Sequence, residues 1–377
     1  MKNPFTYGCI VTGKDFADRK DKLRNLSRDL IDCEKIFLIS PRRYGKSSLI
    51  ANILNNLKKA GLYTIYIDLY KATSLNKFLE LYSREVALSV ENKAEKAVRL
   101  IKEFLPGLRP KITVDGEGNA GIGIDYINSK RDVLKLLDEI YDLPQKLAAK
   151  KKKNFVIAFD EFQEISSYNG DSIEKSMRAY IQNHKNVGYL FAGSKKHILT
   201  DMVRNRNRAF YKIGKTINLN KIPVELFSAF LKEKFAATGF KLEAGVMNNI
   251  INRADNYPYN VQYLCHELWD MNRDKQQLKN SDIEIALYKI LSEETPFYST
   301  IWDGLTHHQR NVLQALAVYG GEKIFSHEFI SAGGIGPSST LQTSVKLLVK
   351  KDILEKENGK YTLADIFFRE WIKRKTI

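Results

Sequence analysis

One loop sets the architecture expected for this chain: Ser40-Pro41-Arg42-Arg43-Tyr44-Gly45-Lys46-Ser47-Ser48. Before it, residues 35–39 form a short apolar run typical of a buried strand. After it, residues 46–57 carry apolar side chains at helical spacing, and residues 63–69 predict a second strand. This order predicts a strand-helix-strand unit whose two strands are parallel.

The same loop has the residue types that bind a phosphate group. The phosphate-binding pattern is G-x-x-x-x-G-K-[ST], and here Ser40 stands in place of the first glycine. Gly45 allows a sharp turn, and the helix that begins near Lys46 adds unsatisfied N–H groups and its positive dipole end. Lys46 can reach the β- and γ-phosphates, and the Ser47 hydroxyl can ligate Mg²⁺. A charged turn that merely contains Gly-Lys-Ser is the alternative, but the position between strand and helix favours a nucleotide site.

We therefore expect the loop to bind nucleotide along its whole length. The expected nucleotide-binding residues in it are Pro41, Arg42, Arg43, Tyr44, Gly45, Lys46, Ser47 and Ser48.

An acidic pair, Asp160-Glu161, ends a strongly apolar predicted strand, residues 154–159. Parallel strands carry their functional residues at their carboxyl ends. We expect Asp160 and Ser47 to hold the metal ion and Glu161 to polarise an attacking water, with Lys46 as the third catalytic residue. The alternative for Asp160 is a helix N-cap.

Other polar residues follow strands or lie close behind them. Ser194 ends the strand at residues 189–193, where it can contact the γ-phosphate or the attacking water, or cap a helix. Asp68 ends the strand beside the loop and is a candidate neighbour of metal or water.

A basic run, Arg204-Asn205-Arg206-Asn207-Arg208, follows soon after Ser194. We take Arg206 as the candidate arginine finger, supplied to a neighbouring molecule or to the chain's own nucleotide. A basic, solvated helix end explains this run equally simply and is the interpretation we favour.

The periodicity changes twice along the chain. Strands alternate with helices over residues 1–222, with a β-hairpin insertion at about 106–126, which predicts an α/β core with a parallel sheet. Residues 223–292 predict helices only. Residues 297–377 predict helices followed by a two-stranded hairpin, the arrangement of a winged helix-turn-helix. Within the core, Pro144 predicts a kink or break near the end of a helix.

Composition limits the class of protein. Hydrophobic residues make up 44% of the 377 residues and charged residues 28%, which excludes a chain disordered throughout. The formal charge of +16 favours an anionic partner such as nucleic acid or nucleotide, and a solvated basic surface is the alternative. No apolar stretch is long enough to span a membrane, and no secretory signal is apparent. Three widely spaced cysteines argue against disulfides and a zinc site, so we expect a cytoplasmic protein.

The sequence resembles the archaeal-type ATPase family, a group of P-loop ATPases related to the STAND and AAA+ proteins. The resemblance is carried by residues 3–8 with Phe16 and Arg19, residues 40–48, 159–163, 192–194 and 257–262, and by the C-terminal residues 361–371. It implies a P-loop core, a helical lid and a winged helix, with ATP and Mg²⁺ as ligands. It also implies that residues 11–13 line the adenine.

The helical lid of such proteins carries a G-x-P element near the nucleotide. Here Asn256 stands where glycine would be, and the element ends in Pro258, which is therefore the implied nucleotide contact on the lid. The guanine-reading pattern N-K-x-D is missing, since Asn220-Lys221-Ile222-Pro223 lacks the aspartate. We therefore expect ATP rather than GTP.

The predicted third helix of the winged-helix region, near residues 338–350, buries one face and exposes another. The exposed residues are expected to be Thr340, Gln342, Thr343, Lys346 and Lys350. Hydroxyl, amide and ammonium groups suit contacts to DNA, but winged helices also dock proteins, and this region is only mildly basic.

Three functional hypotheses remain at this point. The first is an ATP-hydrolysing enzyme that acts as a nucleotide-driven switch. The second is an ATP-gated DNA-binding regulator, and the third is an ATP-binding scaffold without turnover. The sequence leaves open whether the chain forms a homo-oligomer and whether a DNA or protein partner binds the winged helix.

Overall fold

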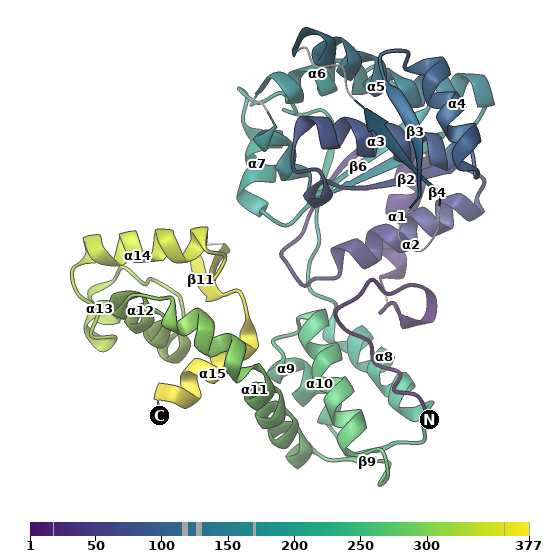
Figure 1. The fold of residues 1–377 in the computed structure, drawn as a ribbon. Helices are drawn as coiled ribbons and strands as arrows, with labels where there is room; N and C mark the ends of the chain where they lie inside the picture. The colour runs from purple at the N-terminus through teal and green to yellow at the C-terminus, as the bar shows by residue number, and fades with distance from the viewer. Residues whose placement is uncertain (18, 115–119, 126–129, 169–170, 358, 377) are drawn as a thin grey trace. The chain divides into compact units, whose positions relative to one another are not determined.

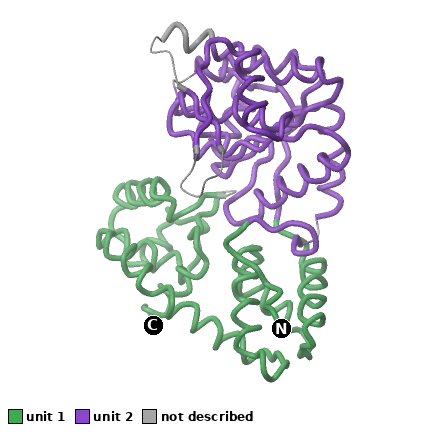
Figure 2. Tube along the Cα trace, turned by 45° about the vertical axis from the view of Figure 1, so that its right-hand side comes forward, with its two compact units in different colours: residues 1–9, 221–377 green, residues 10–220 purple. Residues whose placement is uncertain are grey.

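The chain folds into two compact units. The structure, a computed structural model, describes residues 1–17, 19–114, 120–125, 130–168, 171–357 and 359–376. One unit contains residues 10–220, and the other contains residues 1–9 together with residues 221–377 (Figure 2). The backbone therefore passes between the units at two places, after residue 9 and after residue 220.

The unit of residues 10–220 is built on one parallel sheet, with strands in the order β2-β5-β6-β1-β7 (Figure 1). These strands are β1 (Lys35–Ile39), β2 (Tyr63–Asp68), β5 (Phe155–Asp160), β6 (Val187–Gly193) and β7 (Lys215–Asn218). A separate antiparallel hairpin consists of β3 (Arg109–Val114) and β4 (Ala120–Asp125). The helices are α1 (Lys20–Ile31), α2 (Lys46–Lys59), α3 (Leu75–Val90), α4 (Ala94–Phe104), α5 (Lys130–Lys151), α6 (Asp171–Ile181) and α7 (Lys196–Arg204). Three short 3₁₀ helices are η1 (Gly13–Asp15), η2 (Leu69–Lys71) and η3 (Phe162–Ser167).

The apolar strands are buried on both faces, as expected for a parallel sheet. Alternate side chains such as Phe37, Ile157 and Phe191 belong to one large core shared with helices α3 to α7. The intervening residues face α1 and α2. Gly188, for example, has no room for a side chain because a Cβ atom there would lie 2.6 Å from the Leu30 carbonyl oxygen of α1.

The strand order gathers the predicted site residues at one edge of the sheet. β6 lies between β1 and β5, so the residues that follow these three strands meet at their carboxyl ends. The residues concerned are the loop after β1, the acidic pair at the end of β5, and Ser194 after β6.

The second unit is mainly helical. Its first part contains α8 (Val224–Ala236), α9 (Val246–Arg253), α10 (Pro258–Met271) and α11 (Asn280–Asp303), with β8 (Lys241–Leu242) paired in parallel to β9 (Gln277–Leu278). Its second part contains α12 (His307–Tyr319), α13 (His327–Ala332), α14 (Ser338–Lys350), the hairpin strands β10 (Leu354–Glu357) and β11 (Lys360–Leu363), and α15 (Ile366–Thr376).

The structure differs from the sequence-based expectations at several elements. Pro144 does not end its helix, because α5 continues to Lys151 and buries Tyr141 and Leu147 on both sides of the proline. The region predicted to contain helices only also holds the short β8–β9 pair. Helix α11 crosses residues 292–297, where a boundary was expected, and carries Pro296 inside it. Residues 115–119, inside the hairpin predicted at about 106–126, and Asn358, inside the hairpin predicted near the C-terminus, lie outside the described residues.

The central strand β5 provides a test of the packing. Ile157 is fully buried, so Ile157→Ala should remove packing contacts, leave a cavity and lower the free energy of unfolding by about 2–5 kcal/mol. Ile31→Ala is the matched control at the exposed end of α1 and should change it by no more than about 0.5 kcal/mol. Urea unfolding followed by circular dichroism measures both. Equal effects of the two substitutions would contradict the assigned core.

Candidate active site

The loop between β1 and α2 takes its sharp turn at Arg43 and Gly45. Both residues have left-handed backbone conformations, with φ values of 64° and 78°. Ser40 is not among the residues with positive φ; its N–H donates to the Gly193 carbonyl (3.2 Å), in continuation of the sheet. A glycine is therefore not required at the position of Ser40, which explains why the loop tolerates the exchange.

Lys46, the first residue of α2, joins the loop to the end of β5. Its ammonium group contacts Asp160 Oδ1, and it lies 2.5 Å from Glu161 Oε1. Lys46 and Asp160 are both buried, with 7% and 3% of their surfaces exposed. Gly45, the N-cap residue of α2, has no side chain, so no side-chain cap hydrogen bond forms at the start of this helix.

Asp160 accepts hydrogen bonds from two neighbouring hydroxyls. Ser47 Oγ donates to Asp160 Oδ2 at 2.7 Å, and Tyr66 OH donates to the same oxygen at 2.9 Å. Ser47 and Asp160 thus present a hydroxyl and a carboxylate side by side, the hard oxygen ligands that Mg²⁺ prefers. Asp68 lies opposite Asp160 in the sheet, but its Oδ1 accepts the N–H of Tyr70, so its described role is to cap η2.

Glu161 is held in a strained conformation. Its φ and ψ are 52° and 45°, a left-handed region that a glutamate rarely adopts. Its carboxylate is fixed by Lys46, by Ser194 Oγ at 2.8 Å and by Gln163 Nε2 at 2.6 Å. Gly193 leaves the room that Gln163 needs, because a Cβ atom there would lie 2.1 Å from Gln163 Oε1.

The environment of the acidic pair shifts two pKa values. Burial by itself would raise the pKa of Glu161, but the nearby Lys46 and the hydrogen bonds from Lys46, Gln163 and Ser194 lower that pKa below its usual value. Burial, followed by the charge of Asp160, raises the pKa of Tyr66. Tyr66 therefore remains a hydrogen-bond donor and Glu161 remains ionised at neutral pH.

A buried arginine is hydrogen-bonded to the backbone of the phosphate-binding loop. Arg19, just before α1, donates from Nη2 to the Tyr44 carbonyl at 2.8 Å. Burial lowers the pKa of Arg19 to about 10, so the guanidinium stays charged at neutral pH. Its Nη1 is buried and has no hydrogen-bond partner among the described residues.

The segment of residues 11–13 is bound to the helix that follows the loop. Val11 N donates to Ser48 Oγ at 3.1 Å, and Gly13 N donates to Asn52 Oδ1 at 3.0 Å. Asn52 Nδ2 donates in return to the Val11 carbonyl at 3.0 Å. This segment, implied by the resemblance to line the adenine, is therefore attached to the N-terminal half of α2.

The predicted arginine finger does not join the cluster. Arg206 is exposed in the turn after α7, and among the described residues it has no contact with the acidic pair. Arg208 ties helices α6 and α7 together through Glu174 (2.5 Å) and Asp201 (3.0 Å). The structure thus gives Arg208 a structural role, while a catalytic role of Arg206 stays a prediction.

Pro258 belongs to the other unit, where it is the first residue of α10. Asn256, two residues before it, has a φ of 53° and donates to the Ile222 carbonyl at 2.8 Å. Asparagine tolerates this left-handed conformation better than most residues, which accounts for its presence where the resemblance implies glycine. A contact between Pro258 and nucleotide stays a prediction.

Sequence reasoning missed three polar residues that complete the site: Asn52, Tyr66 and Gln163. Asn52 interrupts the apolar face of α2 one turn after Ser48, which is a signal the sequence did contain. Gln163 lies within the segment 159–163 that carries the resemblance, but the sequence assigned it no role of its own. Tyr66 gave no signal, because its contact with Asp160 depends on the pairing of β2 with β5.

The fold and this cluster together define the class of the protein. A parallel sheet with the phosphate-binding loop after β1 and a carboxylate pair after β5 is the fold of a P-loop ATPase. The model of a family described as an ATPase domain predominantly from Archaea matches residues 16–264. The chain therefore belongs to this family, and a model of a probable winged helix domain matches residues 296–374. Both findings confirm the resemblance and the fold class predicted from the sequence.

Solved structures show the same fold over nearly the whole chain. A Walker-type ATPase of Pyrococcus abyssi is similar with a TM-score of 0.66 and 16% identity, over 98% of this chain and 99% of that one. The ORC1 protein of Aeropyrum pernix, solved in complex with DNA, is similar with a TM-score of 0.52 and 11% identity, over 97% and 94%. The ORC2 protein of the same organism has a TM-score of 0.50 and 13% identity, over 99% of this chain and 98% of that one.

No curated protein matches the sequence. Across the described residues, no helix is both long enough and apolar enough to span a bilayer.

The ion pair between Lys46 and Glu161 predicts a pH effect on stability. The pKa of Glu161 is lower in the folded protein than its ordinary value of about 4.3, which applies to the unfolded chain. Ionised Glu161 therefore stabilises the fold fully above this ordinary value, and the stabilisation is lost as the pH falls through the folded-state pKa. Lys46→Met should raise the pKa of Glu161, because burial then acts without the ammonium group. The gain in unfolding free energy between about pH 3 and pH 6 should therefore be smaller than in the wild type.

Urea unfolding at a series of pH values measures this difference. The control is Lys59→Met, at the exposed end of the same helix, which should leave the pH profile unchanged. A wild-type profile in Lys46→Met would show that Lys46 does not govern the ionisation of Glu161.

Proposed function

We propose that this protein is a Mg²⁺-dependent enzyme that binds and hydrolyses ATP and acts as a nucleotide-driven switch of the STAND/AAA+ type. The observation that carries the proposal is the buried cluster of Lys46, Ser47, Asp160 and Glu161, at the start of α2 and the end of β5. These residue types in this arrangement fit a triphosphate with its metal ion.

Each member of the cluster has a role in this proposal. Lys46 turns its ammonium group from the carboxylates to the β- and γ-phosphates, while the N–H groups of the first turn of α2 bind the same phosphates. Ser47 and Asp160 would hold Mg²⁺, which would supply positive charge to the phosphate oxygens. Glu161 accepts the proton of the attacking water, and Ser194 keeps the Glu161 carboxylate oriented.

Two further observations support nucleotide binding in this unit. Arg19 Nη1 is a buried cationic donor next to the loop, with no protein partner in the described part of the chain. Residues 11–13 are hydrogen-bonded to α2, where they can line the adenine.

The switch follows from chain connectivity. Residues 10 and 220 each lead from the nucleotide-binding unit into the other unit, and residues 11–13 are attached to α2 directly behind the phosphate-binding loop. In this proposal, a change at the loop on ATP binding or hydrolysis reaches the connection at residue 10 through residues 11–13. It reaches the connection at residue 220 through Leu219, whose N–H donates to the Ile39 carbonyl at 2.8 Å just before the loop. Pro258 supplies a contact from the lid in this proposal.

Turnover is tested by phosphate release. Lys46→Ala should abolish release of phosphate from ATP, because the phosphate contact is lost. Glu161→Gln should lower turnover by about 100-fold or more yet keep ATP bound, because the proton acceptor alone is removed. Lys59→Ala is the control and should match the wild type. If the wild-type protein binds ATP but releases no phosphate, and Glu161→Gln leaves ATP retention unchanged, the protein is a binding scaffold rather than an ATPase.

DNA binding by the winged helix is the second candidate function, favoured by one surface of α14. Leu341, Val345 and Leu348 are buried on one side of the helix. Thr340, Gln342, Thr343, Lys346 and Lys350 are exposed on the other, as expected from the sequence. One of the proteins of similar fold was solved bound to DNA, which makes this face the one to test.

A salt titration of duplex binding tests this function. Lys346→Ala should weaken binding and reduce the slope of log K against log salt by about one, because one phosphate contact is lost. Lys241→Ala, an exposed lysine outside the winged helix, is the control. Failure of the wild-type protein to bind duplex DNA at low salt would leave α14 as a candidate protein-docking helix.

A further inference from the structure

Strand β2 forms one open edge of the sheet. It pairs with β5 on one side, and in the described part of the chain no strand pairs with its other side. Tyr63 N donates to the Asn154 carbonyl at 3.1 Å, so Tyr63 and every second residue after it face β5. Thr64 and Tyr66 therefore direct their backbone N–H and C=O groups to the open edge, where they can pair with a further strand.

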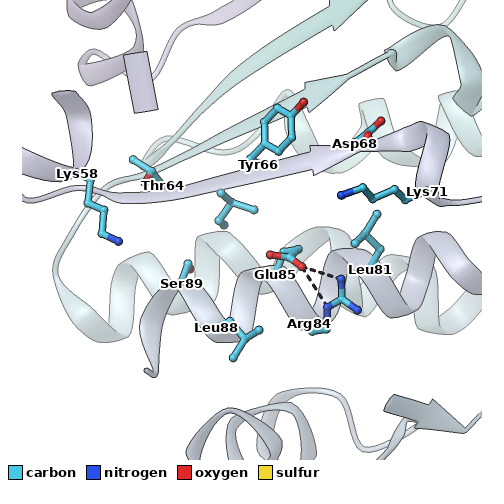
Figure 3. Close-up of a pocket in the computed structure, with 11 residues that line it drawn as sticks. Lys58, Thr64, Tyr66, Asp68, Lys71, Leu81, Arg84, Glu85, Leu88 and Ser89 are labelled. Atoms are coloured by element: carbon cyan, nitrogen blue, oxygen red, sulfur yellow. Dashed lines mark hydrogen bonds and ion pairs between the residues drawn. The ribbon is translucent and has the colours of Figure 1, made fainter. Parts of the chain in front are cut away.

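A groove runs along this edge between β2 and α3. Its volume is about 360 Å³, and Figure 3 shows its lining. The β2 side is lined by Thr64, Ile65, Tyr66 and Asp68, and the α3 side by Leu81, Arg84, Glu85, Leu88 and Ser89. β2 has six residues and is about 20 Å long, so its open edge can pair with an extended peptide of about six residues.

The groove has unpaired positive charge at both ends. Lys58, at the end of α2, and Lys71, just after β2, line opposite ends of it (Figure 3). Neither ammonium group has a carboxylate partner among the described residues. Arg84, by contrast, forms an ion pair with Glu85 at 2.8 Å. The Asp68 carboxylate accepts the Tyr70 N–H and keeps its negative charge. Three basic and two acidic side chains line the groove, so its net charge is positive and an acidic partner complements it.

We propose that this edge of β2 docks an extended peptide segment of a partner protein, which adds to the sheet as a further strand and places acidic side chains at Lys58 and Lys71. Backbone pairing with Thr64 and Tyr66 supplies the affinity, and the two lysines select the sequence. Leu81 and Leu88 of the α3 wall pack against aliphatic side chains of the peptide.

Tyr66 links the groove to the catalytic cluster of Lys46, Ser47, Asp160 and Glu161. Tyr66 borders the groove, and its hydroxyl donates to Asp160 Oδ2 at 2.9 Å. A partner paired with β2 thus contacts the strand that supports the metal-binding carboxylate. The groove and the nucleotide site share Tyr66, but Lys58, Thr64 and the residues of α3 that line the groove are not part of the nucleotide site. Peptide binding can therefore be measured without ATP turnover.

A displayed library of random ten-residue peptides, selected on the full-length protein, provides the probe. Enriched peptides should carry acidic residues toward both ends and aliphatic residues between them. A synthetic copy of the best peptide should bind in fluorescence anisotropy, and a copy with N-methylated backbone should bind at least about tenfold more weakly, because it cannot pair with the strand.

Two pairs of variants test the location. Thr64→Pro removes an N–H that faces the open edge and takes no part in the sheet, so it should weaken peptide binding at least about tenfold, whereas Thr64→Val should not. Lys58→Glu should also weaken binding, whereas Lys59→Glu, one residue further along the same helix turn, should not. Circular dichroism and ATP binding confirm that each variant is folded.

Three results would overturn the proposal: no enriched peptide, a peptide that binds Thr64→Pro as tightly as Thr64→Val, or one that tolerates N-methylation. The last would indicate a pocket for a small anion instead of a strand-docking edge. None of these results affects the proposed ATP site, which is measured separately.

Discussion

The buried contact between the Lys46 ammonium group and the carboxylates of Asp160 and Glu161 is the interaction on which the site depends. Charged groups are costly to bury alone, so each of these side chains requires the others. Only one strand, β6, lies between β1 and β5. The carboxyl ends of β1 and β5 are therefore close enough for these side chains to meet. The ion contacts therefore require this strand order. A different order would separate Lys46 from the two carboxylates and leave a buried charge without a partner.

Two residues of the site have left-handed backbones although neither is glycine. They are Arg43 in the phosphate-binding loop and Glu161 after β5. Such conformations persist only where the surroundings fix them, and at Glu161 this is done by Lys46, Ser194 and Gln163. The protein's own side chains thus fix the orientation of the carboxylate, which reduces the reorganisation that a reaction at this site would need.

Much of the fold was predictable because its signals are local. The loop at residues 40–48, the apolar strand before Asp160 and the exposed face of α14 follow from periodicity and from residue type. The neighbours of β2 were not predictable, because strand order depends on packing between distant segments. The role of Tyr66 therefore emerged only from the structure. Helix α5 continued past Pro144 because burial of its apolar face outweighs one lost backbone hydrogen bond.

Isothermal titration calorimetry with MgATP and the folded, full-length protein tests the central claim most directly. The account predicts a saturable heat that fits one site per chain. It also predicts that the heat is lost in Ser47→Ala/Asp160→Ala, which lacks both proposed metal ligands. Folded protein that releases no heat with MgATP, or a double variant that binds like the wild type, would contradict the account.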